Sequence, residues 1–224
     1  MEAVWKLLSW WALFAGTHML FSSLWLRPRL VKLLTLDGFL VTYSLIAFFV
    51  IVPLFVTYMA NRHEGPLLWA LPHSPWLIGI VTVGVGLAFI LFAAGFLTPS
   101  PVIRGMPYDG PKGAHLISRH CLFMGFALWA LMHLLVNGYA TDVVFFGGFV
   151  VFSIVGSWHQ DRRKLASGDT VFAEFYATTP FLPFTGKHTW RGLKEFSKAA
   201  IAVGIGLTVL IRMFHTELFV SPGG

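Results

Sequence analysis

Six long stretches of this sequence contain no Lys, Arg, Asp or Glu, and their spacing constrains the fold more than any other feature. They cover residues 7–26, 38–61, 76–97, 120–141, 143–160 and 199–211. An apolar helix needs about 20 residues to cross a bilayer. The last stretch is short, but it reaches further if the side chain of Arg212 extends to the interface. We therefore predict an all-α fold, a polytopic membrane helix bundle with six transmembrane helices.

The composition excludes two other classes of protein. Hydrophobic residues make up 56% of the 224 positions and charged residues 12%. A soluble domain has about 25% charged residues, and a disordered chain needs more charge than this one carries. The six helices account for nearly all of the apolar residues, so we treat 1–224 as a single transmembrane domain. The single cysteine, Cys121, excludes an internal disulfide and any multi-cysteine metal site.

The basic residues are distributed unequally between the two sides that six helices create. Of the 16 Lys and Arg residues, the following fall on one side: Arg27, Arg29, Lys32, Arg104, Lys112, Arg119, Arg162, Arg163, Lys164, Lys187, Arg191, Lys194 and Lys198. The other side has Lys6, Arg62 and Arg212. Because cytoplasmic loops collect Lys and Arg, we predict that both termini lie on the non-cytoplasmic side. This rule also explains the net charge of +6, and no nucleic-acid partner is expected.

Residues 161–198 form the only sizeable extramembrane segment in this topology. The segment begins with basic residues, continues with a short half-apolar helix at 171–177, and then carries Pro180 and Pro183 among aromatic residues. We interpret it as a cytoplasmic interfacial segment between helices five and six. Whether it only contacts the anionic headgroups of the lipid bilayer or forms part of a site stays open at this point.

Two histidines lie deep inside predicted helices, where an ionisable residue is costly and marks a candidate site. His18 lies eight residues before Leu26, which places it about 12 Å from that boundary, and His133 lies fourteen residues after Arg119, about 21 Å in. Imidazole binds transition metals and haem iron. Without acidic partners, two such histidines favour a porphyrin over a carboxylate-bound metal ion. The alternative is that each only hydrogen-bonds a neighbouring helix.

The neighbours of these histidines on their own helices extend the hypothesis. Gly125, two turns before His133, removes a side chain where a flat ring could approach. Ser22, one turn after His18, is a candidate to orient its imidazole. The two histidines differ in depth by about 9 Å, so one porphyrin joins both only if the helices or the ring plane tilt.

Several motifs, in order and spacing, resemble the NnrU family. They are Phe14-Ala15-Gly16-Thr17-His18, Leu26-Arg27-Pro28, Tyr43-Ser44-Leu45, Ser118-Arg119-His120-Cys121-Leu122-Phe123-Met124-Gly125, Leu128-Trp129-Ala130, His133-Leu134-Leu135-Val136-Asn137-Gly138, Gly156-Ser157-Trp158-His159-Gln160-Asp161-Arg162-Arg163-Lys164 and Thr178-Thr179-Pro180-Phe181-Leu182-Pro183-Phe184. The resemblance extends from about residue 3 to residue 190.

The resemblance implies a bacterial inner-membrane protein associated with denitrification and nitric oxide metabolism. It also implies a relationship to zeta-carotene isomerase, which binds haem b through histidines and isomerises a cis double bond in a redox-dependent way. Matched motif by motif, the haem ligands fall on His18 and His133. Cys121 stands where the family usually has proline. Ala130 stands where the isomerase has a cysteine, so a switch to thiolate ligation is unavailable.

Three functional readings follow. The first is a haem b protein that acts on a lipophilic polyene or in nitrogen-oxide metabolism, with Arg119, His120 and Arg162 either pairing with haem propionates or anchoring the topology. The second is a membrane methyltransferase of the isoprenylcysteine type, which uses S-adenosylmethionine; here Arg162 follows Asp161 where that type has paired acidic residues. The third is a non-catalytic assembly partner of a respiratory reductase.

Overall fold

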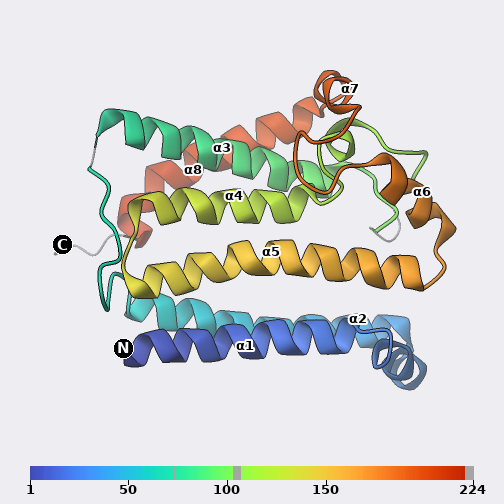
Figure 1. The fold of residues 1–224 in the computed structure, drawn as a ribbon, viewed down its shortest axis with the longest axis horizontal. Coiled ribbons are helices and arrows are strands. Elements are labelled where there is room, and N and C mark those ends of the chain that lie inside the picture. Colours follow the sequence, from blue (N-terminus) through green and yellow to red (C-terminus); the bar gives the residue numbers. More distant parts are fainter. Residues whose placement is uncertain (73, 103–106, 220–224) are drawn as a thin grey trace. The chain divides into compact units, whose positions relative to one another are not determined.

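The computed structural model describes residues 1–72, 74–102 and 107–219, and the regular structure within them is helical (Figure 1). Its elements are α1 (Glu2–Ser22), α2 (Arg27–Ala60), α3 (Pro75–Leu97), the 3-10 helix η1 (Gly113–Leu116), α4 (Cys121–Val136), α5 (Ala140–Ala166), α6 (Thr170–Thr178), α7 (Thr189–Lys194) and α8 (Lys198–Phe219). The only extended pairing in these ranges is an isolated bridge between Leu67 and Tyr139. The all-α prediction is confirmed for the described residues.

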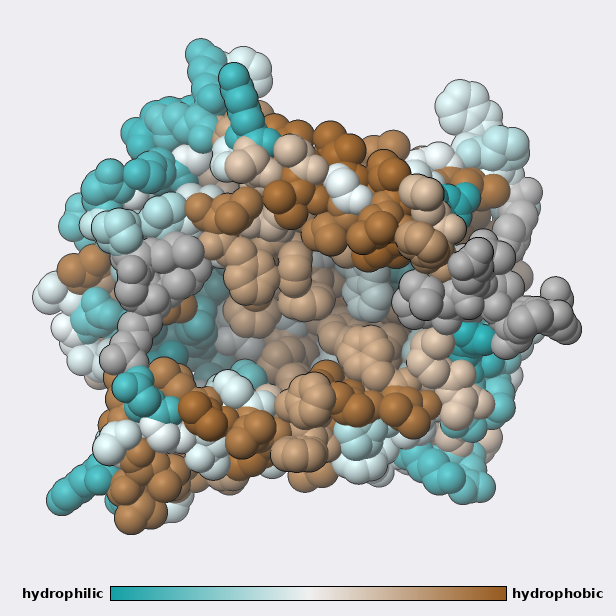
Figure 2. All heavy atoms as spheres, turned by 180° about the vertical axis from the view of Figure 1, so that it is seen from behind, coloured by the Kyte–Doolittle hydropathy of each residue, from teal (hydrophilic) through white to brown (hydrophobic). Residues whose placement is uncertain are grey.

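Four of the helices are long and apolar enough to cross a membrane: α2, α3, α5 and the 198–215 part of α8. Helix α4 is apolar but has only 16 residues, and α1 is not among the four. Figure 2 shows brown, hydrophobic side chains gathered over the central parts of the helices and teal, hydrophilic ones towards their ends. The structure therefore fits a multi-pass membrane protein, while the number of six spans stays a prediction.

Helix α2 consists of two helical segments that meet at Thr35. This residue has φ 64° and ψ 169°, which no helix contains and which a β-branched residue rarely adopts. Its hydroxyl accepts a hydrogen bond from the backbone N–H of Gly38 at 3.3 Å, so Thr35 caps the second segment. The basic residues at the start of α2 therefore belong to a short helix of their own.

The chain divides into two compact units. Unit 1 contains residues 1–71 and 134–167, and unit 2 contains residues 72–133 and 168–224. In unit 1, helices α1, α2 and α5 pack side by side around buried apolar residues, among them Leu7, Leu54 and Phe145. The ring of Tyr58 stacks on Phe145 with centroids 3.9 Å apart, which joins α2 to α5.

Unit 2 is built on close contacts at glycines. A side chain at Gly84 would collide with Met132 of α4, and one at Gly204 would collide with Ile90 of α3. The sequence pattern of small residues predicts such packing in membrane helices, and it is confirmed at these positions. The same pattern predicts close packing at Gly147 of α5 and Gly206 of α8, and there it is wrong, because among the described residues no atom beyond the adjoining residues and the local helix backbone lies within 4 Å of where their side chains would be.

Candidate functional site

His18 lies in unit 1 on the face of α1 that packs against α2 and α5. Its ring is surrounded by Phe14 of the preceding turn, Tyr43 of α2 and Phe152 of α5, at centroid distances of 5.3, 4.6 and 5.3 Å. The Tyr43 hydroxyl donates a hydrogen bond to the backbone carbonyl of His18 at 3.2 Å. Helix periodicity places residues four apart on the same face, which explains why Phe14 and His18 lie together.

Between His18 and the start of α1, a layer of aromatic residues forms the contact between α1 and α5. The indole of Trp11 lies flat on Gly148, where a side chain would displace it, and it meets Phe149 edge-on at 4.9 Å. Phe14 contacts Phe152 at 4.9 Å. From His18 towards the start of α1, the surroundings of its ring are therefore apolar and aromatic.

The Nδ1 atom of His18 is buried and has no hydrogen-bond partner within the described residues. Buried polar atoms are nearly always hydrogen-bonded, so an orphaned ring nitrogen needs an explanation. The predicted orientation of His18 by Ser22 is wrong: the Ser22 hydroxyl bonds the carbonyl of Met19 and lies 3.1 Å from Nε2 of His159.

His133 lies in unit 2, near the end of α4. Its Nδ1 donates a hydrogen bond to the backbone carbonyl of Trp129 at 2.8 Å, and its ring lies 4.7 Å from the indole of Trp129. Because a carbonyl only accepts, Nδ1 carries the proton in the neutral ring and Nε2 carries the lone pair. This is the tautomer in which a histidine binds a metal through Nε2.

The two histidines belong to different units, so their joint ligation of one iron stays a prediction. The role predicted for Gly125 is wrong. A side chain there would lie 2.7 Å from the carbonyl oxygen of Ala88 and 2.9 Å from the backbone nitrogen of Phe92, both on α3. The missing side chain therefore permits close packing of two helices and leaves no room for a flat ring.

The segment before α4 interlocks with the segment after α6, within unit 2. The backbone N–H of Arg119 donates to the carbonyl of Pro180 at 2.9 Å, and its guanidinium donates to the carbonyl of Thr179 at 2.7 Å. The hydroxyl of Ser118 donates to the carbonyl of Phe181 at 2.6 Å. Two of the sequence motifs, although about 60 residues apart, are thus joined by hydrogen bonds.

Aromatic rings surround the basic residues of the same region. The guanidinium of Arg119 lies 4.2 Å from the ring centre of Tyr176, and the ring of buried His120 meets Phe181 at 5.3 Å. Burial lowers the pKa of His115 in η1, so this imidazole is neutral at pH 7. In unit 1, Arg162 is exposed and lies over Trp158. Propionate binding by Arg119, His120 and Arg162 stays a prediction.

The thiol of Cys121 is buried at the start of α4, and its sulfur lies 3.1 and 3.0 Å from the carbonyls of Ala114 and Ser118. A thiol in this position contributes to packing and closes the first turn. Although Arg119 and His120 lie beside it in the sequence, Cys121 is predicted to be an inert residue at the helix start rather than a reactive thiol, and these contacts agree with that prediction.

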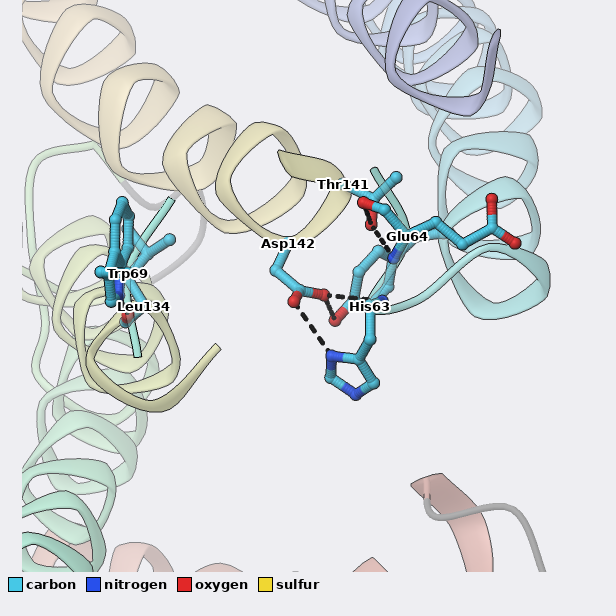
Figure 3. Close-up of polar contacts among 7 residues, drawn as sticks. His63, Glu64, Trp69, Leu134, Thr141 and Asp142 are labelled. Atoms are coloured by element: carbon cyan, nitrogen blue, oxygen red, sulfur yellow. Dashed lines mark hydrogen bonds and ion pairs between the residues drawn. The ribbon is translucent and has the colours of Figure 1, made fainter. Parts of the chain in front are cut away.

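Sequence reasoning missed a polar cluster in unit 1, at the other end of the helices from Ser22. Asp142 of α5 is fully buried, and its carboxylate accepts hydrogen bonds from the Tyr58 hydroxyl at 3.0 Å and the His63 backbone N–H at 3.3 Å. The Nδ1 atom of His63 lies 2.9 Å from the same carboxylate (Figure 3). An acidic residue in the first turn is typical of a helix start, but the uncharged stretches end at residue 141 and resume at residue 143, so they leave Asp142 out.

A second contact fixes the loop before this cluster. The Thr141 hydroxyl exchanges hydrogen bonds with the backbone of Glu64, and the indole N–H of Trp69 donates to the carbonyl of Leu134 (Figure 3). His63 adopts a φ of 58°, which a non-glycine residue holds only when its surroundings fix it. The cluster thus closes unit 1 at the end opposite His18.

The sequence is similar to known proteins of two plants. The chain is 28% identical over 184 residues to a protein of Zea mays and 26% identical over 217 residues to one of Arabidopsis thaliana, both described as 15-cis-zeta-carotene isomerase, chloroplastic. The matches cover 76% and 91% of this chain and 44% and 57% of those proteins, so the chain spans about half the length of these relatives. No solved structure matches it. The family described as NnrU protein matches residues 6–222, and the chain therefore belongs to the NnrU family.

Proposed function

We propose that this chain is a haem b-binding membrane protein of six spans, with His18 and His133 as the iron ligands. The observation that carries the proposal is the buried Nδ1 of His18, which has no partner in the described residues and lies among three aromatic rings. An imidazole nitrogen that has no hydrogen bond inside the protein is available to bind iron, because a metal can bind either ring nitrogen. The donor chemistry, imidazole among aromatic side chains, therefore suits haem.

The second ligand is supported by the tautomer of His133, because the hydrogen bond to Trp129 leaves the lone pair on Nε2. Haem iron, when bound, supplies one-electron and Lewis-acid chemistry. The protein's own contribution is to hold the imidazoles and to exclude water with the aromatic residues around His18. Tyr43 fixes the backbone of His18 through its hydroxyl and limits the rotation of the imidazole by contact.

We infer that the activity is the redox-dependent cis–trans isomerisation of a lipophilic polyene. The support is family membership together with two relatives whose names state a 15-cis-zeta-carotene isomerase. An apolar polyene would reach the protein through the bilayer, which fits the several apolar helices. The resemblance to the NnrU family also implies a role in denitrification and nitric oxide metabolism, which is the alternative to be tested beside it.

The test is an absorption spectrum of detergent-purified protein, oxidised and reduced. We expect a Soret band in the wild type and its loss or a marked shift in His18→Ala and His133→Ala. His188→Ala is the matched control, because His188 is an exposed histidine outside the apolar helices, and it keeps the wild-type spectrum. A wild type that stays free of haem when haem is supplied in excess contradicts the proposal.

Turnover separates the isomerase from an assembly partner. Reduced, haem-loaded protein is incubated with 15-cis-zeta-carotene, and the isomers are separated by chromatography. Conversion by the wild type and none by His18→Ala supports the isomerase. A haem-loaded protein that leaves the substrate unchanged, yet purifies together with a respiratory reductase, supports the assembly role instead.

A further inference from the structure

Basic side chains gather in unit 1 near the end of α1, the start of α2 and the end of α5, which is the end of the helices nearer to His18. Beyond His18, the ring of His159 on α5 lies 3.1 Å from the Ser22 hydroxyl. The guanidinium of Arg27, at the start of α2, lies 5.5 Å from the ring centre of Phe39, which in turn stacks on Tyr43. Towards this end of unit 1, the aromatic residues around His18 are therefore followed by polar and then by basic side chains.

Arg163 completes this cationic end. It lies one turn after His159 on α5, and burial, together with the positive charge of Arg27, lowers the pKa of its guanidinium. Its Nε atom is buried and has no hydrogen-bond partner among the described residues. A guanidinium carries five N–H donors and never loses its charge, so a buried donor left unpaired is costly.

No carboxylate in the described ranges forms an ion pair with Arg27 or Arg163. Two guanidinium groups that approach each other repel, and partial burial strengthens the repulsion because the dielectric constant is lower. The arrangement becomes favourable when an anion lies between them, since Arg binds carboxylates and phosphates through paired hydrogen bonds.

We propose that Arg27, His159 and Arg163 form a binding site for the anionic headgroup of an amphiphile. The shared chemistry is a carboxylate or phosphate attached to an apolar group. Two sources carry it: the carboxylates of a porphyrin and the phosphate of an anionic lipid. Only the porphyrin source depends on the proposed function, and the lipid source is independent of it.

The porphyrin arm compares haem with haem dimethyl ester, in which both carboxylates are blocked, by absorbance titration of purified full-length protein. If the carboxylates bind here, wild type prefers haem by about tenfold or more, since a hydrogen bond between charged groups contributes on that scale. Arg163→Gln and Arg27→Gln reduce this preference, and Arg163→Lys, which keeps the charge, retains most of it.

The lipid arm measures retention of phosphatidylglycerol against phosphatidylcholine by native mass spectrometry of haem-free protein. If the phosphate binds here, the wild type retains the anionic lipid and Arg163→Gln does not. His18→Ala keeps this retention, so a failure of haem binding is distinguishable from a failure of the anion site. Arg29→Gln is the matched control in both arms, because Arg29 lies at the same end but is exposed and packs over Trp25.

A preference for the acid over the ester assigns the site to a porphyrin, and retention of the anionic lipid assigns it to a lipid; either supports the proposal. The proposal is overturned if the wild type prefers neither anionic ligand. It is also overturned if Arg27→Gln and Arg163→Gln bind both anionic ligands as the wild type does.

Discussion

At the scale of single residues, depth in the membrane identified His18 and His133 from the sequence, because an imidazole in an apolar helix stands out. The neighbours were harder to assign. The sequence suggested that Gly125 leaves room for a ring, but the backbone of α3 occupies that space. Arg163 was counted only as a topology signal, because partners in space are not visible in a one-dimensional pattern.

Asp142 provides a prediction at this scale. Asp142→Asn keeps one buried oxygen for the Tyr58 hydroxyl and the His63 backbone N–H, but it places an NH₂ group against Nδ1 of His63 and removes the negative charge. We expect the free energy of unfolding in detergent to fall by about 1–3 kcal/mol. The control is Glu64→Gln, since the Glu64 side chain is exposed and only its backbone joins the cluster. Equal stability of both variants would show that the buried carboxylate is not needed.

At the scale of elements, the uncharged stretches predicted the positions of the long helices well but their ends less well. The uncharged stretch extends over residues 120–141, but the Asn137-Gly138 turn predicts an earlier helix end, and α4 does end at Val136 before α5 begins at Ala140. The break follows from the Asn137-Gly138 turn, where the carbonyl of Gly138 accepts from Leu68 of a distant loop. Such a long-range contact is not encoded in local hydropathy.

Two glycines on different helices test close packing. Gly125→Ala introduces a methyl group 2.7 Å from the Ala88 carbonyl, whereas Gly147→Ala introduces one into open space. We expect Gly125→Ala to destabilise by about 1–3 kcal/mol through overpacking. Gly147→Ala should be neutral or stabilising by up to about 1 kcal/mol, because alanine has the higher helix propensity. Thermal unfolding in detergent gives both values, and reversed signs would contradict the assigned helix contacts.

The interlocked segments at the start of α4 give a second prediction for an element. Arg119→Gln removes the guanidinium from the Tyr176 ring and weakens its bond to the Thr179 carbonyl. The segment after α6 should then detach more often, and limited trypsin digestion should cut faster at Lys187. Arg162→Gln, on an exposed side chain over Trp158, serves for comparison and should leave the cleavage rate unchanged.

At the scale of the whole molecule, composition predicts a membrane protein, since 56% of the residues are hydrophobic and 12% charged, and the uncharged stretches predict several spans. The structure adds four helices that meet the requirements of length and hydropathy within the described residues. The division into two units was not foreseen, because it depends on contacts between helices far apart in the chain.

Sidedness can be measured with single cysteines in a Cys121→Ala background. The charge distribution predicts that Glu64→Cys lies on the non-cytoplasmic side and Lys187→Cys on the cytoplasmic side. Both positions are exposed outside the long helices. A membrane-impermeant maleimide should label residue 64 in intact cells and residue 187 only after permeabilisation. Labelling of both from one side would contradict an arrangement with six spans.

The contact between Arg119 and Thr179 has a consequence for biosynthesis. The two residues are 60 positions apart, so the first turn of α4 lacks its partners when it leaves the ribosome. At about 5–20 residues per second, the missing carbonyls arrive some 3–12 s later. During this interval the residues just before α4 in the nascent chain lack their hydrogen-bond partners, and a chaperone or the insertion machinery has time to bind them.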